Sequence, residues 1–356
     1  MTINSSLPEF LRVNKSPHTG VIKQEPSDFV VNEKLGYDPV GHGEHAFILI
    51  QKTSETTPRI AKQLARHADV NLRQVSYAGL KDKHGVTSQW FSVQLPGKPS
   101  PDWTELNSDY IQVLQSTRHD RKLKRGHIRS NFFSITVRDF SGDESDLNKF
   151  IERVNQYGVP NYFTEQRFGI EGNNLDKALA LLDGEPVRIK NARARKEQEA
   201  QRGLYISAAR SLLFNCVLSK RVEREDWNKA IEGDLFIKTG RHGMFSVDTI
   251  DDEIKSRLSD QEISPTGPLY GLGSDMSASG EALQIEIDTM QGYEDYQKLL
   301  EHLKVQADRR ALRLSVNNLK VNCLSSGEVR LEFELQSGSY ATAVLRELIQ
   351  YPGGMK

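Results

Sequence analysis

The pattern of hydrophobic and polar positions changes character twice along the 356-residue chain. The first part holds short runs typical of β-strands. They alternate over residues 28–33 and 132–137, and the run over residues 46–52 begins with five apolar residues. Helical spacing dominates the middle, and alternation returns over residues 309–316 and 327–335. The chain therefore reads as strand-rich sequence on both sides of a helix-rich segment.

Apolar residues spaced three and four apart predict the helices. Thr57 is a fitting N-cap, Pro58 fits the first helical position, and Ile60 and Leu64 then repeat on one face. The same spacing predicts helices over residues 144–157, 174–182, 205–221, 294–304 and 340–350, the last capped by Ser339.

The helix-rich middle has the character of an insertion. Residues 158–163 break the strand pattern, and strand alternation resumes after residue 307. Insertions are tolerated where their two ends lie close together on a surface. We therefore expect one domain built from residues 1–157 and 308–356, a second domain over residues 158–307, and a cleft between them.

A charged turn is the most informative stretch for chemistry. Asp82 stands between Lys81 and Lys83, and strand-like runs over residues 74–78 and 88–95 flank the turn. A carboxylate beside cations at a strand end stays ionised at neutral pH, and loops at strand ends often carry reactive groups. The local pattern fits an ordinary charged hairpin tip equally well.

Charge is unevenly distributed although the net charge is only -1. Residues 118–129 read RHDRKLKRGHIR, between strand-like runs, and a second basic block covers residues 188–202. Acidic residues concentrate instead over 223–234 and 248–262. Segregated basic blocks favour a polyanionic partner. The candidate RNA-binding residues are Arg118, Arg121, Lys122, Lys124, Arg125, Arg129, Arg193 and Arg195.

Composition narrows the classes of protein that remain. Hydrophobic residues make up 37% and charged residues 27%, as in soluble globular proteins, and two distant cysteines, Cys216 and Cys323, fit a reducing cytoplasm. We expect no signal peptide in the first fifteen residues and no membrane span. His42 and His45 lack further ligands nearby, so we expect no metal site.

An aromatic pair follows the first basic block. In a strand, Asn131 and Phe133 share one face and Phe132 takes the other. We expect Phe132 in the core and Phe133, beside a polar residue, as a platform for stacking a base. Lys23 precedes a strand of the same part of the chain and can pair with Asp82, although its spacing alone fits a solvent-exposed lysine better.

Six blocks, taken in order, resemble one family. The sequence resembles the TruD family of tRNA pseudouridine synthases over KQEPSDFVVNE (23–33), YAGLKDK (77–83), RKLKRGH with NFF (121–127, 131–133), GVPNYFTEQRFG (158–169), SAARS (207–211) and GSYAT (338–342). The match spans nearly the whole chain. It departs from the family pattern at Thr164, where Gly is common, and at Lys83 and His84, where an Arg-containing pair is more usual.

This resemblance implies an α+β fold with a mixed, largely antiparallel sheet and helices, and a family-specific inserted α/β domain. It implies isomerisation of uridine 13 in the dihydrouridine arm of tRNA to pseudouridine. The catalytic aspartate falls on Asp82, its basic partner on Lys23, and the Asn and Phe of the third block on Asn131 and Phe133. No cofactor is expected, and we expect a monomer.

Two alternatives stay open. A protein of the same fold can bind RNA, as a chaperone does, without performing chemistry. A metal-dependent hydrolase built on His42, His45 and Asp82 is the other, and its activity would be lost with a chelator. Within the favoured function, Asp82 either attacks C1′ or removes the 2′ proton.

Overall fold

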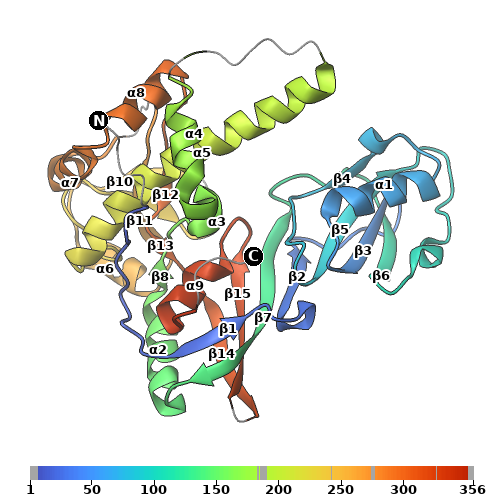
Figure 1. The fold of residues 1–356 in the computed structure, drawn as a ribbon, viewed down its shortest axis with the longest axis horizontal. Coiled ribbons are helices and arrows are strands. Elements are labelled where there is room, and N and C mark those ends of the chain that lie inside the picture. The colour runs from blue at the N-terminus through green and yellow to red at the C-terminus, as the bar shows by residue number, and fades with distance from the viewer. Residues whose placement is uncertain are drawn as a thin grey trace.

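The structure is a computed structural model that describes residues 7–182, 184, 191–241, 243–273, 277–325 and 327–351. Its fold is α+β. One large sheet extends through the lower and right-hand parts of Figure 1, and most helices gather at the upper left around a smaller sheet. In the described part of the chain, no helix is both long enough and apolar enough to cross a membrane.

In the described residues, nine strands form the large sheet, in the order β14-β15-β7-β2-β5-β3-β6, with β1 on β7 and β4 on β5. The described pairs are antiparallel except β2 and β5. The strands are β1 (Thr19–Ile22), β2 (Phe29–Leu35), β3 (His45–Thr53), β4 (Val75–Tyr77), β5 (Val86–Gln94), β6 (Ile111–His119), β7 (Ile128–Ser141), β14 (Asn317–Ser325) and β15 (Glu328–Gln336). The expected mixed, largely antiparallel sheet is confirmed.

Strand β7 lies in the interior of this sheet, because β2 and β15 pair with its two edges. Phe133 lies between Val31 and Phe333, and Asn131 lies between Glu33 and Leu335. Directly opposed residues share a face of a sheet. The register therefore places Glu33 and Asn131 side by side, one step along from the apolar row of Phe133.

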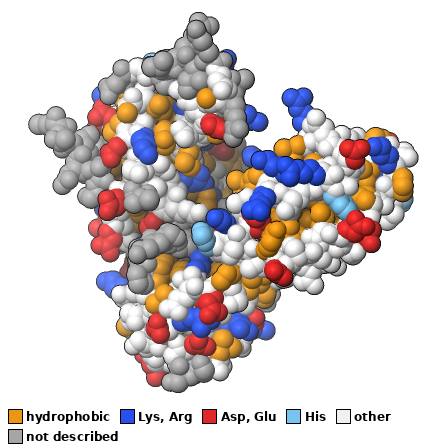
Figure 2. Space-filling view, turned by 45° about the vertical axis from the view of Figure 1, so that its right-hand side comes forward, with side chains coloured by type: hydrophobic (Ala, Val, Ile, Leu, Met, Phe, Trp, Pro, Cys, Tyr) orange, Lys and Arg blue, Asp and Glu red, His pale blue; other side chains and the backbone are white. Residues whose placement is uncertain are grey.

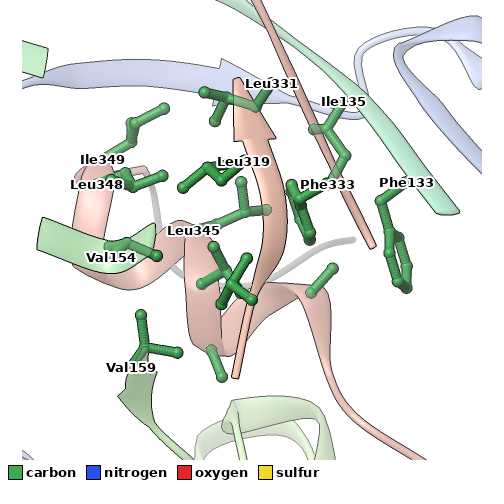
Figure 3. Packing of buried hydrophobic residues seen from close by; sticks show 14 of the residues in the cluster. Phe133, Ile135, Val154, Val159, Leu319, Leu331, Phe333, Leu345, Leu348 and Ile349 are labelled. Atoms are coloured by element: carbon green, nitrogen blue, oxygen red, sulfur yellow. The ribbon is translucent and has the colours of Figure 1, made fainter. Parts of the chain in front are cut away.

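Helices α2 (Glu144–Tyr157) and α9 (Ala341–Leu348) contribute to the core on this face (Figure 3). Val154 and Leu345 are fully buried together with Ile135 and Phe333 of the sheet. Complete burial of such a side chain contributes roughly 1.5–3 kcal/mol. The prediction of a helix over residues 144–157 is confirmed to the residue.

Helix α1 (Thr57–His67) covers the other end of the sheet, where Ile60 and Leu64 pack in one cluster with residues of β3 and β5. The N-cap is Thr56, one residue before the predicted one. The hydroxyl of Thr57 donates instead to the side-chain oxygen of Gln89 on β5, at 2.8 Å. This bond ties the first turn of α1 to the sheet.

The second part of the fold has its own sheet, in the order β10-β9-β11-β12. A separate core forms around the long helix α5. The elements are α3 (Glu165–Phe168), α4 (Asn173–Leu179), α5 (Ala192–Glu223), β9 (Leu235–Lys238), β10 (Met244–Ser246), α6 (Asp252–Ser259), β11 (Ile263–Leu269), α7 (Gly280–Met290), α8 (Glu294–His302) and β12 (Asp308–Ala311). Strands β8 (Val159–Pro160) and β13 (Arg313–Leu314) pair antiparallel where the chain enters and leaves this part.

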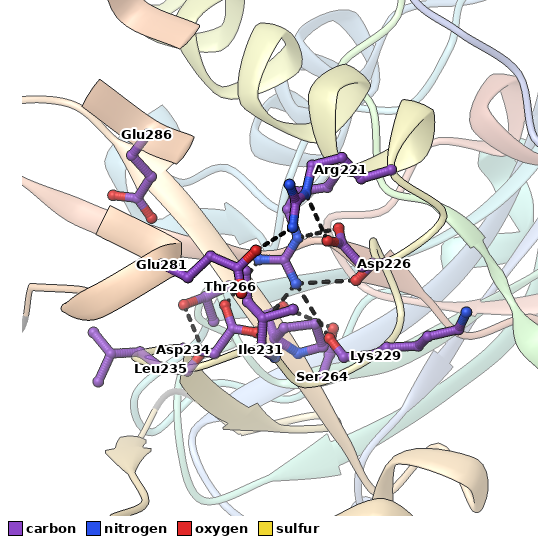
Figure 4. A network of polar contacts seen from close by, with 12 residues as sticks. Arg221, Asp226, Lys229, Ile231, Asp234, Leu235, Ser264, Thr266, Glu281 and Glu286 are labelled. Carbon is purple, nitrogen blue, oxygen red and sulfur yellow. Dashed lines mark hydrogen bonds and ion pairs between the residues drawn. The ribbon is translucent and has the colours of Figure 1, made fainter. Parts of the chain in front are cut away.

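A buried charge network fixes the end of α5 (Figure 4). The guanidinium of Arg221 donates to Asp226 at 2.6 Å and to Asp234 at 2.9 Å, and its own side chain is only 3% exposed. Burial raises the pKa of Asp234, which the bonds from Arg221 oppose. Breaking a buried pair of this kind is strongly destabilising, because one charge stays behind unpaired.

Several predicted elements differ from the structure in extent. Helix α5 is longer than predicted and takes in part of the second basic block. Helices α6 and α7 and strand β14 had no predicted counterpart. The predicted final helix over 340–350 is α9, which begins at Ala341 after the N-cap Tyr340. The division of the chain into two domains stays a prediction.

Candidate functional site

The turn that carries Asp82 is held by three buried side chains from three different elements. Gln89 of β5 donates to the carbonyl of Gly79 at 2.7 Å, and the hydroxyl of Thr57 accepts from the amide of Lys81 at 3.1 Å. Lys52 of β3 donates to the carbonyl of Asp82 at 2.7 Å. The backbone of this turn is thus fixed although it has no regular secondary structure.

Lys52 has an unusual environment for a lysine. Its side chain is 1% exposed, and its ammonium donates to the carbonyl of Glu55 at 2.7 Å as well as to that of Asp82. Burial lowers the pKa of Lys52 to about 8, against the opposing charges of Asp82 and Glu55. A buried lysine with two carbonyl acceptors places positive charge directly beneath the turn.

Lys23 and Asp82 meet at the surface of the site. The ammonium of Lys23 lies 3.7 Å from the carboxylate of Asp82, and the Lys23 side chain is 7% exposed against 36% for Asp82. Lys23 has a φ of 59°, which is uncommon for a residue other than glycine. Burial lowers the pKa of Lys23, and the charge of Asp82 opposes that shift. The carboxylate is therefore accessible while its cation is held in place.

Lys81 connects Asp82's turn to the sheet. Its ammonium lies 2.9 Å from the carboxylate of Glu33 and donates to the amide oxygen of Asn131 at 2.7 Å. Burial raises the pKa of Glu33, and Lys81 and the amide of Trp90 oppose the shift. In the described part of the chain, the Asn131 amide nitrogen makes no hydrogen bond.

The structure reverses the predicted roles of the aromatic pair. Phe132 is 37% exposed, so the prediction that it lies in the core is wrong. Phe133 is 7% exposed and stacks on Phe333 at 5.3 Å between ring centroids. It also meets Phe29 edge-on at 6.3 Å, and the ammonium of Lys23 lies 3.8 Å above the Phe29 ring.

The reason for this reversal is the packing of β7. Its Phe133 face carries the core that α2 and α9 help to build, whereas Phe132 points to the other side. Alternation along a strand separates two faces but does not say which face a helix will cover. Phe133 therefore supports Lys23 through Phe29 and offers only a small part of its own surface.

The first basic block forms the connection between β6 and β7. Leu123 anchors it: its side chain packs in one cluster with Trp90 and Ala78, and its amide donates to Ser92 at 3.1 Å. Ala78 precedes the turn of Asp82, so the block lies beside the site. The exposed members are Arg121, Lys122, Lys124, Arg125 and Arg129. Arg118 differs, because it is half-buried and donates to the carbonyl of Lys98.

The second basic block is only partly described. Arg188, Lys190 and the side chain of Arg193 lie outside the described residues. Arg195 lies on α5 and pairs with Glu199 at 3.3 Å. Figure 2 shows a deep notch between the two parts of the molecule, with Lys and Arg side chains gathered along its wall. The notch offers a positively charged surface.

Sequence reasoning missed four residues that hold the site together. Lys81 and Glu33 lie in blocks quoted for the family resemblance, but nothing in their spacing shows that they meet. Lys52 ends an apolar run and Gln89 lies inside a strand, so both read as ordinary strand residues. Within the described residues, no group of three His, Cys, Asp or Glu side chains is placed to hold a metal ion.

Comparison with known proteins shows the family of the chain. The family model for tRNA pseudouridine synthase D (TruD) matches residues 9–187 and 177–348. The chain is 45% identical to the tRNA pseudouridine synthase D of Methylococcus capsulatus, covering 93% of this chain and 91% of that one. The chain belongs to the TruD family.

Further relatives support the same assignment. The tRNA pseudouridine synthase D of Pseudoalteromonas atlantica is 40% identical and matches 94% of each chain. A solved structure from Methanosarcina mazei with that name superposes with a TM-score of 0.71 at 22% identity, over 97% of this chain and 96% of that chain. The structural likeness shows the fold, and membership of the family implies isomerase activity on tRNA.

Proposed function

We propose that this protein isomerises uridine 13 in the dihydrouridine arm of tRNA to pseudouridine, with Asp82 as the catalytic carboxylate. The observation that carries the proposal is the partly exposed Asp82 carboxylate, 3.7 Å from a buried Lys23. Asn131 accepts a hydrogen bond from Lys81, the residue before Asp82. A carboxylate, its cation and a polar group thus lie together beside a positively charged notch.

The chemistry is a rearrangement within one nucleotide. The bond from N1 of uracil to C1′ breaks, a bond from C5 to C1′ forms, and the C5 proton is exchanged for one on N1. Nothing is oxidised and no group is imported, so no cofactor enters the balance. Asp82 either attacks C1′ or takes the 2′ proton, and both routes need its ionised form.

The neighbouring groups have separate tasks in this proposal. The Lys23 ammonium favours the ionised carboxylate through its opposite charge. The amide nitrogen of Asn131 is available to donate to a uracil carbonyl while Lys81 holds its oxygen. Phe133 positions Lys23 by packing under Phe29. A stacked or paired base is out of reach, so the target must be flipped out of its helix.

The exposed residues of the first basic block would hold the RNA backbone beside this site. They project from a connection that Leu123 anchors close to the turn of Asp82. Contacts to phosphates bind strongly at low salt and weaken as salt rises. Arg118 contributes less in this proposal, because its guanidinium already donates to a carbonyl.

We also propose that residues 158–307 form an inserted domain. The pairing of β8 with β13 supports this proposal, since it brings together the two points where the chain enters and leaves that segment. Hydrogen exchange measured by mass spectrometry under mildly denaturing conditions should then show this segment losing protection as one unit, separately from the strands of the large sheet. Equal loss of protection in both parts would oppose the proposal.

The decisive experiment replaces the carboxylate by an amide. Asp82→Asn should leave the Kd for unmodified tRNA within a few-fold and abolish pseudouridine formation, measured by mass spectrometry of the treated tRNA. Asp69→Asn is the matched control, because this exposed residue already has a φ of 48°, which Asn tolerates. Substantial turnover by Asp82→Asn would overturn the assignment.

The same assay separates the alternative functions. If the wild-type protein binds tRNA but forms no pseudouridine at any position, a non-catalytic RNA-binding protein is the better description. Pseudouridine at another position would support the proposed reaction but refute uridine 13 as its target. Loss of product in the presence of a chelator would instead favour the metal-dependent reaction.

A further inference from the structure

A second positively charged feature lies apart from the turn of Asp82. A pocket of about 230 Å³ forms where the smaller sheet meets the end of β15. The turn between β9 and β10 and the strands β12 and β13 line it, together with Gln336 and Ser339. None of the described lining residues is acidic, and five are basic: Lys238, Arg241, Arg309, Arg310 and Arg313.

Two of these arginines are used by the fold. Arg309 pairs with Glu286 at 2.5 Å, so its charge is compensated. Arg313 is 5% exposed and donates to the carbonyls of Leu258 and Ile263. These contacts explain why the two side chains are buried. Among the described residues, the other three basic residues of the pocket have no ion pair, although the charge of Lys238 acts on Glu262 at longer range.

Arg310 is the residue that suggests a ligand. Its guanidinium is half-buried and lies 4.3 Å from the centre of the Phe163 ring. It donates to the side-chain oxygen of Asn161 at 2.6 Å, a neutral partner. In the described part of the chain it has no carboxylate partner, and its Nη1 makes no hydrogen bond. Burial lowers the pKa of Arg310 to about 10, which still leaves it charged at neutral pH.

The rim of the pocket adds two exposed cations. Lys238 and Arg241 stand on either side of the β9–β10 turn, and neither has a side-chain ion pair among the described residues. Gln336, whose side-chain amide lies beside Gly240 of this turn, pairs in register with Ser130, the residue before Asn131. The lining of the pocket thus includes a residue of the pair next to the row that holds Asn131, on the opposite face of the sheet.

We propose that this pocket binds a phosphate group of the tRNA backbone, held by Arg310 at its base and by Lys238 and Arg241 at its rim. Guanidinium groups match phosphate geometry with two parallel hydrogen bonds, and here one edge of Arg310 is left without a partner. The proposal rests on the proposed function, because tRNA supplies the phosphate. It adds a contact from the smaller sheet, opposite the basic block between β6 and β7.

The test is a binding measurement that does not depend on turnover. The double variant Lys238→Gln with Arg241→Gln should raise the Kd for an unmodified tRNA transcript roughly tenfold at moderate salt. The slope of log Kd against log salt should fall by up to about one, as expected when the contact to one phosphate is lost. Lys255→Gln with Lys298→Gln is the matched control, since both are exposed lysines outside the pocket.

A further variant examines the base of the pocket. Arg310→Gln should weaken tRNA binding as strongly as the rim variant, and Arg310→Lys should restore part of it. Thermal unfolding of both proteins shows whether the fold survives. If Arg310→Gln does not fold, the rim variant alone decides the outcome.

The possible results separate this proposal from the proposed function. A rim variant with the same Kd and salt slope as the control would refute phosphate binding in the pocket, even if the protein makes pseudouridine. A wild-type protein that makes none, but whose tRNA binding needs the rim residues, would keep the pocket and refute the activity.

Discussion

Single residues around Asp82 divide into those the sequence could reveal and those it could not. The roles of Asp82, Lys23 and Asn131 came from the family resemblance, and the structure pairs Lys23 with Asp82 and Asn131 with the neighbouring Lys81. The pairing of Lys23 with Asp82 could not be derived from spacing, because 59 residues separate them and only the fold closes that distance. The burial of Phe132 and Phe133 was predicted the wrong way round for a similar reason, since burial depends on which face of the sheet the helices cover.

Lys52 provides a prediction at this scale. Lys52→Met should lower the single-turnover rate of pseudouridine formation at least tenfold without changing the Kd for tRNA, because the carbonyl of Asp82 loses its buried donor. The wild-type rate should fall above about pH 8, where Lys52 loses its proton, and the variant should lack this decline. A purely structural role would change the melting temperature and leave the shape of the pH profile intact.

The same lysine affects stability with a definite sign. Its folded pKa of about 8 lies below the unfolded value of 10.5, so the unfolded state binds more protons between these pH values. Stability from this group therefore rises with pH over that window. Urea unfolding at pH 7.5 and 9.5 should show a smaller gain in Lys52→Met than in wild type. An equal gain in stability in the two proteins would contradict the lowered pKa of Lys52 in the folded state.

At the scale of elements, the anchored connection between β6 and β7 is the feature with the clearest consequence. Its cations are exposed while Leu123 is buried, so charge and anchor can be changed separately. Helix α2 was predicted to the residue from its apolar spacing, and in the structure Asp143 caps its first turn. Helix α5 was predicted too short, because the polar residues of its first turns carry no apolar stripe.

Removing charge from this connection should weaken tRNA binding. Gln at Arg121, Lys122, Lys124 and Arg125 should flatten the salt dependence of log Kd by up to about three to four, one for each lost phosphate contact. The control is the replacement of Arg121 and Arg125 by Lys, which keeps the positive charge and should keep the slope. An unchanged slope in the Gln variant would make the block an ordinary solvated surface.

At the scale of the whole molecule, separate hydrophobic clusters occupy the large sheet and the helix-rich part. This separation allows one part to be weakened without the other. Strand-rich ends and a helix-rich middle were visible from periodicity alone. The second sheet was visible only in fragments, since β11 lies in a stretch rich in Gly, Ser and Pro, which is typical of loops.

Arg221→Met tests this independence. Loss of the guanidinium leaves Asp234 buried without its ion-pair partner, whereas Asp226 keeps Arg224, at a cost of about 3–5 kcal/mol. Hydrogen exchange measured by mass spectrometry should rise in peptides from α5 to β9, while peptides of β2 and β3 keep their protection. Arg224→Met is the control, because that side chain is 37% exposed. A uniform rise would show that the two parts unfold together.

The position of β7 between β2 and β15 also constrains how the chain can fold. Ser130 and its partner Glu334 are 204 residues apart in sequence. One edge of β7 therefore stays open on the ribosome until almost the whole protein has been made. Long-range pairing of this kind slows folding, and until it forms, the unpaired strand edge is open to pairing with other chains. The middle of the chain can fold during that wait, so the sheet that carries Asp82 is completed last.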